Sequence, residues 1–447
     1  MSDVDTWLAT FRTQAASLPG AGLPWLAEIR RRAVERFADE GWPTHRMENY
    51  RHTSLAFLGQ QRYVVPAAAS RSGQAPHAML EQLRADDASG HWLVFVDGAF
   101  AASLSSIGAL PSGAQLGALS EVLARSPERV QAAFGSAEDG ASPVALNAAL
   151  AADGAFVQLA PGVALDAPVH LVFIAATPNG AFQWRNLIVA GAGAQATVVE
   201  HYLGQPVADA LSSSFTNSVT RIDAGPDARL THLKLQQEDA QAVHLATIEA
   251  VQARGASFES HSLSFGARLA RNDIVTRFEG EGCETLFNGL FHVDGRRHAD
   301  HHTRIEHAHP RGTSREFYRG ILDGAARGVF AGRIIVAPGA MRTDAEQRTD
   351  NLLLSPQAEA DARPELEIYA DDVKCAHGAT VGQIDEASLF YLRSRGLDEA
   401  HARNLLTYAF AAEALARIGL VPLRRRAAAA IRARLPGGAL LEELSLS

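Results

Sequence analysis

Hydrophobic residues in the first 40 positions recur every three to four residues, in the segments 7–18 and 25–37. This spacing is typical of amphipathic helices. A short apolar run, Trp92–Val96, precedes the turn Asp97-Gly98 and predicts one strand. Helical spacing resumes after residue 119. Residues 1–150 are therefore predicted to form a mostly helical N-terminal domain.

The pattern changes between residues 151 and 382, where short apolar strands alternate with turns. Turn glycines followed by a strand fall at positions 162, 193, 225, 255, 282, 312 and 339, so their spacing is nearly constant. A constant period of this kind indicates stacked repeats, each too small to bury a face alone. We expect a β-helix or similar β-solenoid core over 151–382, with a β-sandwich as the alternative.

Residues 383–447 return to helical spacing and predict a C-terminal helical domain. Asp385 and Asp398 stand where N-cap residues belong, and Pro422 suits the first turn of a third helix. The architecture predicted from the pattern is mainly β, with a solenoid flanked by two helical regions.

The composition argues against some classes of function but does not identify the function. The 447 residues are 47% hydrophobic and 20% charged, with a net charge of −9 and no long basic run, which argues against a nucleic-acid partner. The short runs Arg30–Arg32 and Arg424–Arg426 are interpreted as solvated helix faces. No apolar stretch is long enough for a membrane span. Two cysteines make no disulfide framework, so a reducing cytoplasm is expected.

The run Cys375-Ala376-His377 carries the most chemistry. In a strand, residues two apart share a face, so the thiol and the imidazole can reach one ligand. Both are ligands for iron or zinc, but two ligands are too few for a closed metal site. The alternatives are a packed thiol beside a hydrogen-bonded histidine, or a Cys–His nucleophile pair, for which no oxyanion motif is present. Cys283, in the turn Gly282-Cys283-Glu284, is interpreted as structural.

A second candidate is a dense group of histidines. Six lie between positions 292 and 309: His292, His298, His301, His302, His307 and His309. Such density suggests a metal site and, with it, a metal-dependent hydrolase built on the solenoid. The other interpretation is a polar face or subunit contact, because no His-Glu-Xaa-Xaa-His motif is present. A phosphate-binding loop is also missing, so ATP hydrolysis by this chain is not expected.

Several long stretches resemble the SufB/SufD family of iron–sulfur cluster assembly scaffolds. They are Arg327–Ile334, Asn351–Ser355, Pro364–Val373 and Leu389–Gly396. Within the family, Cys-Xaa-His-Gly-Ala-Thr at 375–380 is similar to the SufD type, whereas the SufB type has His-Glu-Ala-Thr. The region 1–150 matches only loosely.

The resemblance implies a right-handed parallel β-helix between helical domains, acting as a non-catalytic scaffold. It implies pairing through the β-helix with one SufB-like subunit, and docking of two copies of a SufC-like ABC ATPase on the C-terminal helices. His377, with Cys375, would contact a nascent iron–sulfur cluster at the partner interface, while the main sulfur-accepting cysteine would belong to the partner. A reduced flavin in the whole complex is also implied. An open solenoid edge favours a homodimer of the isolated chain.

Overall fold

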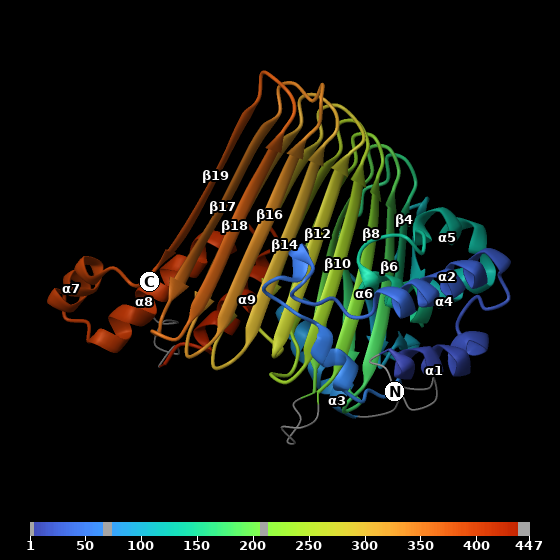
Figure 1. Cartoon of the computed structure of the whole chain (residues 1–447), viewed down its shortest axis with the longest axis horizontal. Helices are drawn as coiled ribbons and strands as arrows, with labels where there is room; N and C mark the ends of the chain where they lie inside the picture. Colours follow the sequence, from blue (N-terminus) through green and yellow to red (C-terminus); the bar gives the residue numbers. More distant parts are fainter. Residues whose placement is uncertain (1–3, 66–73, 206–212, 437–447) are drawn as a thin grey trace.

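Long strands stacked side by side dominate the molecule, with helices near both chain ends (Figure 1). The computed structural model describes residues 4–65, 74–205 and 213–436. One sheet contains, in spatial order, β19 (Lys374–Gly382), β17 (Asp344–Leu353), β15 (Thr313–Leu322), β13 (Glu284–Val293), β11 (Ser257–Ser264), β9 (Arg229–Gln237), β7 (Gln195–Gly204), β5 (Val169–Ala175), β1 (His91–Val96) and β2 (Ala99–Phe100). The other contains β18 (Glu359–Ile368), β16 (Arg327–Val336), β14 (His298–His307), β12 (Leu269–Phe278), β10 (Val243–Gln252), β8 (Phe215–Ala224), β6 (Ala181–Ala190), β4 (Ala155–Leu159) and β3 (Ala114–Ala118).

From β4 on, consecutive strands alternate between the two sheets, and each strand from β4 to β17 pairs in parallel with the next strand but one. The register aligns Ser257 with Glu284 and Gln195 with Arg229, so one rung spans about the spacing of the turn glycines. This is a parallel β-solenoid, and it confirms the repeat prediction. The β-sandwich alternative is wrong, because sandwich sheets are antiparallel.

The glycine marks coincide with the turns between rungs, although not every glycine adopts the left-handed conformation. Gly193, Gly255 and Gly282 have positive φ angles. At the marks 225 and 312 the positive φ belongs instead to a neighbour, Asp227 or Arg311. The repeat period therefore reflects the rung length more than a glycine requirement at each turn.

The interior of the solenoid is filled by alternate residues of every strand. Large apolar side chains such as Phe258, Phe287 and Phe330 stack in one continuous cluster. Ionisable groups, including Glu200 and Glu316, also point inward and are buried. The core is thus apolar over most of its length but contains fully enclosed polar positions.

The described part of the region 1–150 packs directly onto the solenoid. Its helices are α1 (Asp5–Gln14), α2 (Pro24–Glu40), α3 (Gln74–Asp86), α4 (Leu119–Arg125), α5 (Pro127–Phe134) and α6 (Ser142–Leu150). Trp7, Phe37 and Trp42 share a cluster with Phe215 of β8. Strands β1, β2 and β3 also lie in this range and extend the two sheets. The expected helical region and the solenoid are therefore one packed unit.

Both basic runs differ from the prediction, since each contains at least one arginine that is not fully solvated. Arg31 and Arg32 are exposed, but Arg30 is buried and donates to the carbonyl of Pro19 at 2.8 Å. Burial lowers the pKa of Arg30 to about 10. Arg426 is partly buried and pairs with Asp86 at 2.7 Å. Neither run is thus a fully solvated face, because each helix directs at least one of its arginines toward neighbouring residues.

The C-terminal helices of the described chain are α7 (Glu386–Ser394), α8 (Glu399–Leu415) and α9 (Val421–Arg432). Of these, α8 and α9 cover the outer face of the sheet that contains β13 and β15, whereas α7 packs on α8 and projects away from the strands (Figure 1). As predicted, Asp385 and Asp398 cap α7 and α8, accepting from the backbone amides of Ser388 and His401. In the described ranges no helix combines the length and hydrophobicity that crossing a bilayer requires.

Candidate functional site

The solenoid ends in two strands that each have one unpaired edge within the described chain. Strand β19 pairs with β17 alone, and β18 pairs with β16 alone. No further rung covers these two strands among the residues that the structure describes. Such an edge presents free backbone donors and acceptors to another strand.

Cys375 and His377 both lie on the inward face of β19. Their register partners on β17 are Ala345 and Gln347, which are buried in the solenoid interior. Cys375 is half-buried and packs against the core, whereas His377 is exposed. The two predicted site residues therefore share the inward face of β19, as the spacing indicated. This face is left uncovered at the open end of the solenoid.

The local environment keeps the Cys375 thiol protonated. Burial raises its pKa, and Asp344 acts in the same direction, while a backbone hydrogen bond from Ala345 opposes them. A metal binds the thiolate rather than the thiol. A raised pKa therefore disfavours the form of Cys375 that a metal would bind.

The donor set on this chain is incomplete. Throughout the described residues, no group of three or more His, Cys, Asp or Glu side chains is arranged to hold a metal ion. An iron–sulfur cluster is usually held by four protein ligands. Cys375 and His377 together are therefore half of such a site at most.

The open end that holds Cys375 and His377 also has three exposed apolar side chains, here called the apolar rim, which the sequence pattern did not predict: Ile368, Tyr369 and Val381. Ile368 at the end of β18 is 42% exposed, and Val381 on β19 is 48% exposed. Tyr369, next to Ile368, is 61% exposed. The available signal was the apolar residue at inward positions of the last two strands, with no further strand to cover them.

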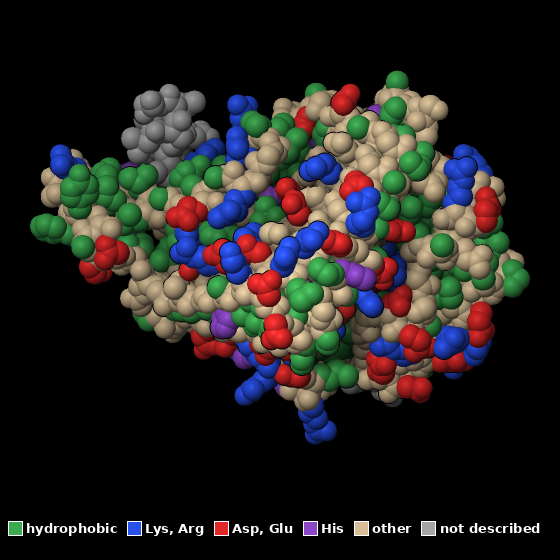
Figure 2. Space-filling view, turned by 90° about the horizontal axis from the view of Figure 1, so that it is seen from above, with side chains coloured by type: hydrophobic (Ala, Val, Ile, Leu, Met, Phe, Trp, Pro, Cys, Tyr) green, Lys and Arg blue, Asp and Glu red, His purple; other side chains and the backbone are tan. Residues whose placement is uncertain are grey.

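A second apolar patch lies on α7. Phe390 and Tyr391 are 74% and 57% exposed. Figure 2 shows hydrophobic side chains gathered at this C-terminal end of the molecule. Both apolar patches are thus close to the C-terminal end of the chain, one on strands and one on a helix.

The six histidines of 292–309 do not form one site. His301 is inside the solenoid, where it stacks on Phe291 with ring centroids 5.3 Å apart. His302 points to the opposite face and pairs with Asp300 at 3.0 Å. The rest are also divided: His292 and His307 are buried, His298 hydrogen-bonds with Thr53, and His309 is exposed. Because the six histidines point in different directions, they form no common metal site, and the hypothesis of a metal-dependent hydrolase has no structural support in the described residues.

Comparison with known proteins covers nearly the whole chain. The family model for the SUF system FeS cluster assembly, SufBD core domain, matches residues 173–410, and that for the SufBD protein N-terminal region matches residues 1–171. The chain is 33% identical to the iron–sulfur cluster assembly protein SufD of Escherichia coli over 91% of this chain and 92% of that protein. It is 31% identical to an iron–sulfur cluster assembly SufBD family protein of Synechocystis, over 95% of this chain and 94% of that protein.

These matches include both the solenoid and the helical regions, and they agree with the sequence resemblance at residues 375–380. The fold, the half-site at its open end and the relatives are mutually consistent. The chain belongs to the SufBD family of iron–sulfur cluster assembly proteins, as a SufD-type member.

Proposed function

We propose that this chain is a non-catalytic scaffold subunit that pairs through the open end of its solenoid with a SufB-like subunit. The observation that carries the proposal is the placement of Cys375 and His377 on the inward face of a terminal strand whose other edge is unpaired in the described chain, so that His377 is exposed at the open end. A partner solenoid added at this edge would continue the rungs by main-chain hydrogen bonds. It would also cover the apolar rim formed by Ile368 and Val381.

At that interface the nascent iron–sulfur cluster is cargo rather than a resident cofactor. The His377 imidazole is exposed and ready to bind, so we give it the leading role. Cys375 follows once a cation favours its thiolate. The partner supplies the remaining ligands, including the main sulfur-accepting cysteine. This division of ligands accounts for the two donors found here.

We further propose that a SufC-like ABC ATPase docks on the C-terminal helices and hydrolyses ATP there. Phe390 and Tyr391 give α7 an apolar face that the rest of the described chain leaves uncovered. In Figure 1, α7 projects away from the solenoid and is accessible to a partner. The two docking surfaces are separate, so one subunit can hold both partners at once.

The reduced flavin is proposed only for the assembled complex. Small-molecule sites enclose most of their ligand. By contrast, every residue of β19 is exposed except Cys375, which is half-buried. The open end of this chain therefore does not fit a flavin by itself. We place the complex in the reducing cytoplasm, a setting supported by the free thiols of Cys283 and Cys375.

Co-purification tests the proposal directly. A tagged copy of this chain, co-expressed with a SufB-like subunit and an ABC ATPase, should retain both. Phe390→Ala with Tyr391→Ala should release the ATPase and keep the SufB-like subunit. Failure of the unmodified chain to retain either protein would refute the scaffold assignment.

A further inference from the structure

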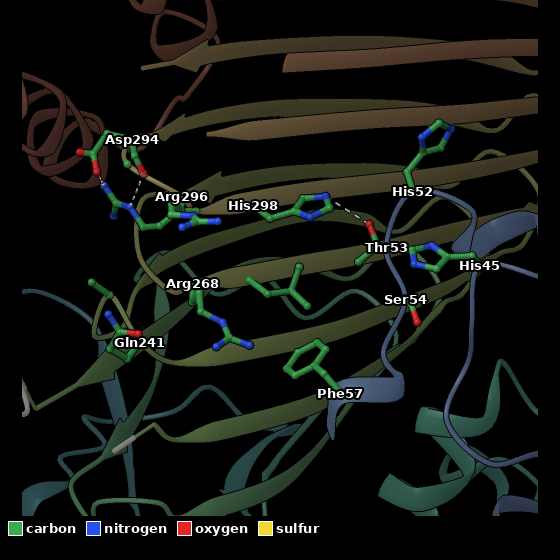
Figure 3. A pocket seen from close by; sticks show the side chains of 14 residues that line it. His45, His52, Thr53, Ser54, Phe57, Gln241, Arg268, Asp294, Arg296 and His298 are labelled. Atoms are coloured by element: carbon green, nitrogen blue, oxygen red, sulfur yellow. Dashed lines mark hydrogen bonds and ion pairs between the residues drawn. The ribbon is translucent and has the colours of Figure 1, made fainter. Parts of the chain in front are cut away.

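A cleft lies on the outer side of the solenoid, away from the open end. It is bounded by the segment 45–57 on one side and by the beginnings of strands β10, β12 and β14 on the other (Figure 3). Its volume is about 910 Å³, which is within the range of small-molecule sites. Residues from four separate parts of the sequence meet there.

The lining is strongly basic. Three arginines line the cleft: Arg268, Arg296 and Arg297. The carboxylate in the lining is that of Asp294, and it is paired with Arg297. The Arg268 guanidinium lies 5.0 Å from the ring centre of Phe57. Within the part of the chain that the structure describes, neither Arg268 nor Arg296 forms an ion pair. Both guanidinium groups are exposed, and neither has a carboxylate partner among the described residues, so both can bind an added anion.

Arg268 and Arg296 lie just before strands β12 and β14, and arginines within the strands of the same sheet differ from them in having carboxylate partners. Arg327 pairs with Asp361 at 2.6 Å, and Arg333 pairs with Glu365 at 2.8 Å. Cross-strand carboxylates thus neutralise guanidinium groups on the outer face of this sheet. Arg268 and Arg296 have no such carboxylate partner in the described chain. An acidic residue at a neighbouring position could have formed an ion pair with either of them.

The neighbouring turn shows that the fold does not require these arginines. Asp294-Gly295-Arg296-Arg297 and Asp323-Gly324-Ala325-Ala326 are stacked copies of one turn, with φ angles of 63° and 64° at the glycines. The amide of Ala325 donates to the carbonyl of Gly295 at 2.7 Å. Alanines occupy the positions of Arg296 and Arg297 in the second copy. The arginines are therefore available for a role other than forming the turn.

We propose that this cleft binds a phosphate-bearing small molecule of about nucleotide size, with Arg268 and Arg296 holding its phosphate groups. A guanidinium matches phosphate oxygens with two parallel hydrogen bonds and is the preferred residue for this contact. Thr53 and Gln241 add polar groups to the lining, and Phe57 and Leu269 add apolar surface. Because segment 45–57 closes one side, the cleft suits a compact ligand better than a long polymer.

Calorimetric titration of the full-length chain tests this site with four probes: inorganic phosphate, pyrophosphate, ADP and adenosine. We expect saturable binding of pyrophosphate and ADP, and none of adenosine. The double variant Arg268→Gln, Arg296→Ala should weaken that binding about a hundred-fold, because each of the two lost charged hydrogen-bonding pairs is worth roughly ten-fold. Tighter binding of ADP than of pyrophosphate would indicate a nucleotide, and the reverse an inorganic ligand.

Arg277→Ala is the matched control, because Arg277 is an exposed arginine on β12 outside the cleft lining. It should leave binding unchanged. The single variant Arg296→Ala copies the Ala325 turn and keeps the test valid if the double variant unfolds. The proposal is overturned if no phosphate probe binds, if the arginine variants bind as well as the unmodified chain, if Arg277→Ala weakens binding equally, or if adenosine binds as tightly as ADP.

Discussion

His377 on β19 lies beside Gln347 on β17 in the register of the sheet, yet Gln347 is fully buried and His377 is exposed. The two side chains occupy equivalent inward positions on consecutive rungs. Gln347 has a rung on both sides, whereas His377 has one on a single side. The exposure of His377 is thus a property of its place at the end of the stack, and one more rung from a partner would enclose it.

Replacing His377 by alanine should reduce cluster formation and leave complex assembly intact. Because the His377 side chain is exposed, the substitution should change the free energy of unfolding by less than about 0.5 kcal/mol. Reconstitution with iron and sulfide, followed by absorbance of the cluster, measures the loss. Size-exclusion chromatography measures assembly.

Ala379→Ser is the control for this experiment, because Ala379 lies on the same face of β19, two residues further on. It should give the cluster yield of the unmodified chain. An undiminished yield in the double variant Cys375→Ser, His377→Ala would instead assign both residues a packing role only.

A lysine in the apolar rim should block pairing at the open end. Val381→Lys, alone or with Ile368→Lys, places a charge on an edge that must be dehydrated when another solenoid docks. We expect at least about a ten-fold loss of affinity for the SufB-like subunit, and loss of any homodimer of the isolated chain. Analytical ultracentrifugation measures both.

Ile107→Lys is the corresponding control, since Ile107 is 40% exposed near β2, at the opposite end of the sheet from β19. It adds the same charge without touching the rim. Equal weakening by Ile107→Lys and Val381→Lys would show that the pairing surface is elsewhere.

The buried carboxyl of Glu316 should make stability depend on pH. Burial raises its pKa from 4.5 to about 7, although hydrogen bonds with Thr303 and Gln347 act in the opposite direction. The folded chain therefore keeps a proton that the unfolded chain loses between these values. The free energy of unfolding should fall as pH rises from about 4.5 through 7, by up to about 3 kcal/mol from this group.

Glu316→Gln removes this titration, so its melting temperature should drop less than that of the unmodified chain between pH 5 and pH 8. Glu346→Gln, at an exposed position on β17, should retain the original dependence. Thermal melts monitored by circular dichroism at several pH values compare the three proteins. Parallel profiles for Glu316→Gln and the unmodified chain would contradict the assignment.

The two thiols should react at different rates. Burial raises the pKa of both, but Cys375 is half-buried whereas Cys283 is inaccessible. At pH 7.5 iodoacetamide should label Cys375 more slowly than a cysteine in an unstructured peptide, and should label Cys283 only after unfolding. Mass spectrometry of timed samples measures both rates. Labelling of Cys375 as fast as the peptide would contradict the prediction. Faster labelling would mean that its thiol is activated in the isolated chain.

Much of the architecture was predictable because it depends on patterns of residues that are close together in the sequence. The regular spacing of the turn glycines predicted the rungs, and the N-caps Asp385 and Asp398 predicted two helix starts. Period-two alternation placed Cys375 and His377 on one face. The same rule, applied to His301 and His302, would have shown that these neighbours point to opposite faces and cannot form one metal site.

Other features depend on contacts between distant parts of the chain. Arg30 is buried where its helix packs near Ala151, whose carbonyl accepts a hydrogen bond from Arg30 at 3.4 Å. Glu316 is enclosed by Thr303 and Gln347 from other strands. No local pattern reports such surroundings. The basic cleft likewise exists only because segment 45–57 crosses strands β10, β12 and β14, which come much later in the sequence.

Residue spacing within single segments was enough to predict the repeat, the helices at both chain ends and the shared face of Cys375 and His377, and the matching stretches of sequence were enough to indicate the family. Only the tertiary structure established that this face is the open end of the stack, with a half-buried thiol, an exposed imidazole and an apolar rim. The reason is that burial and pKa depend on which rungs lie on either side of a strand. For Cys375 and His377, the described chain provides a rung on one side only.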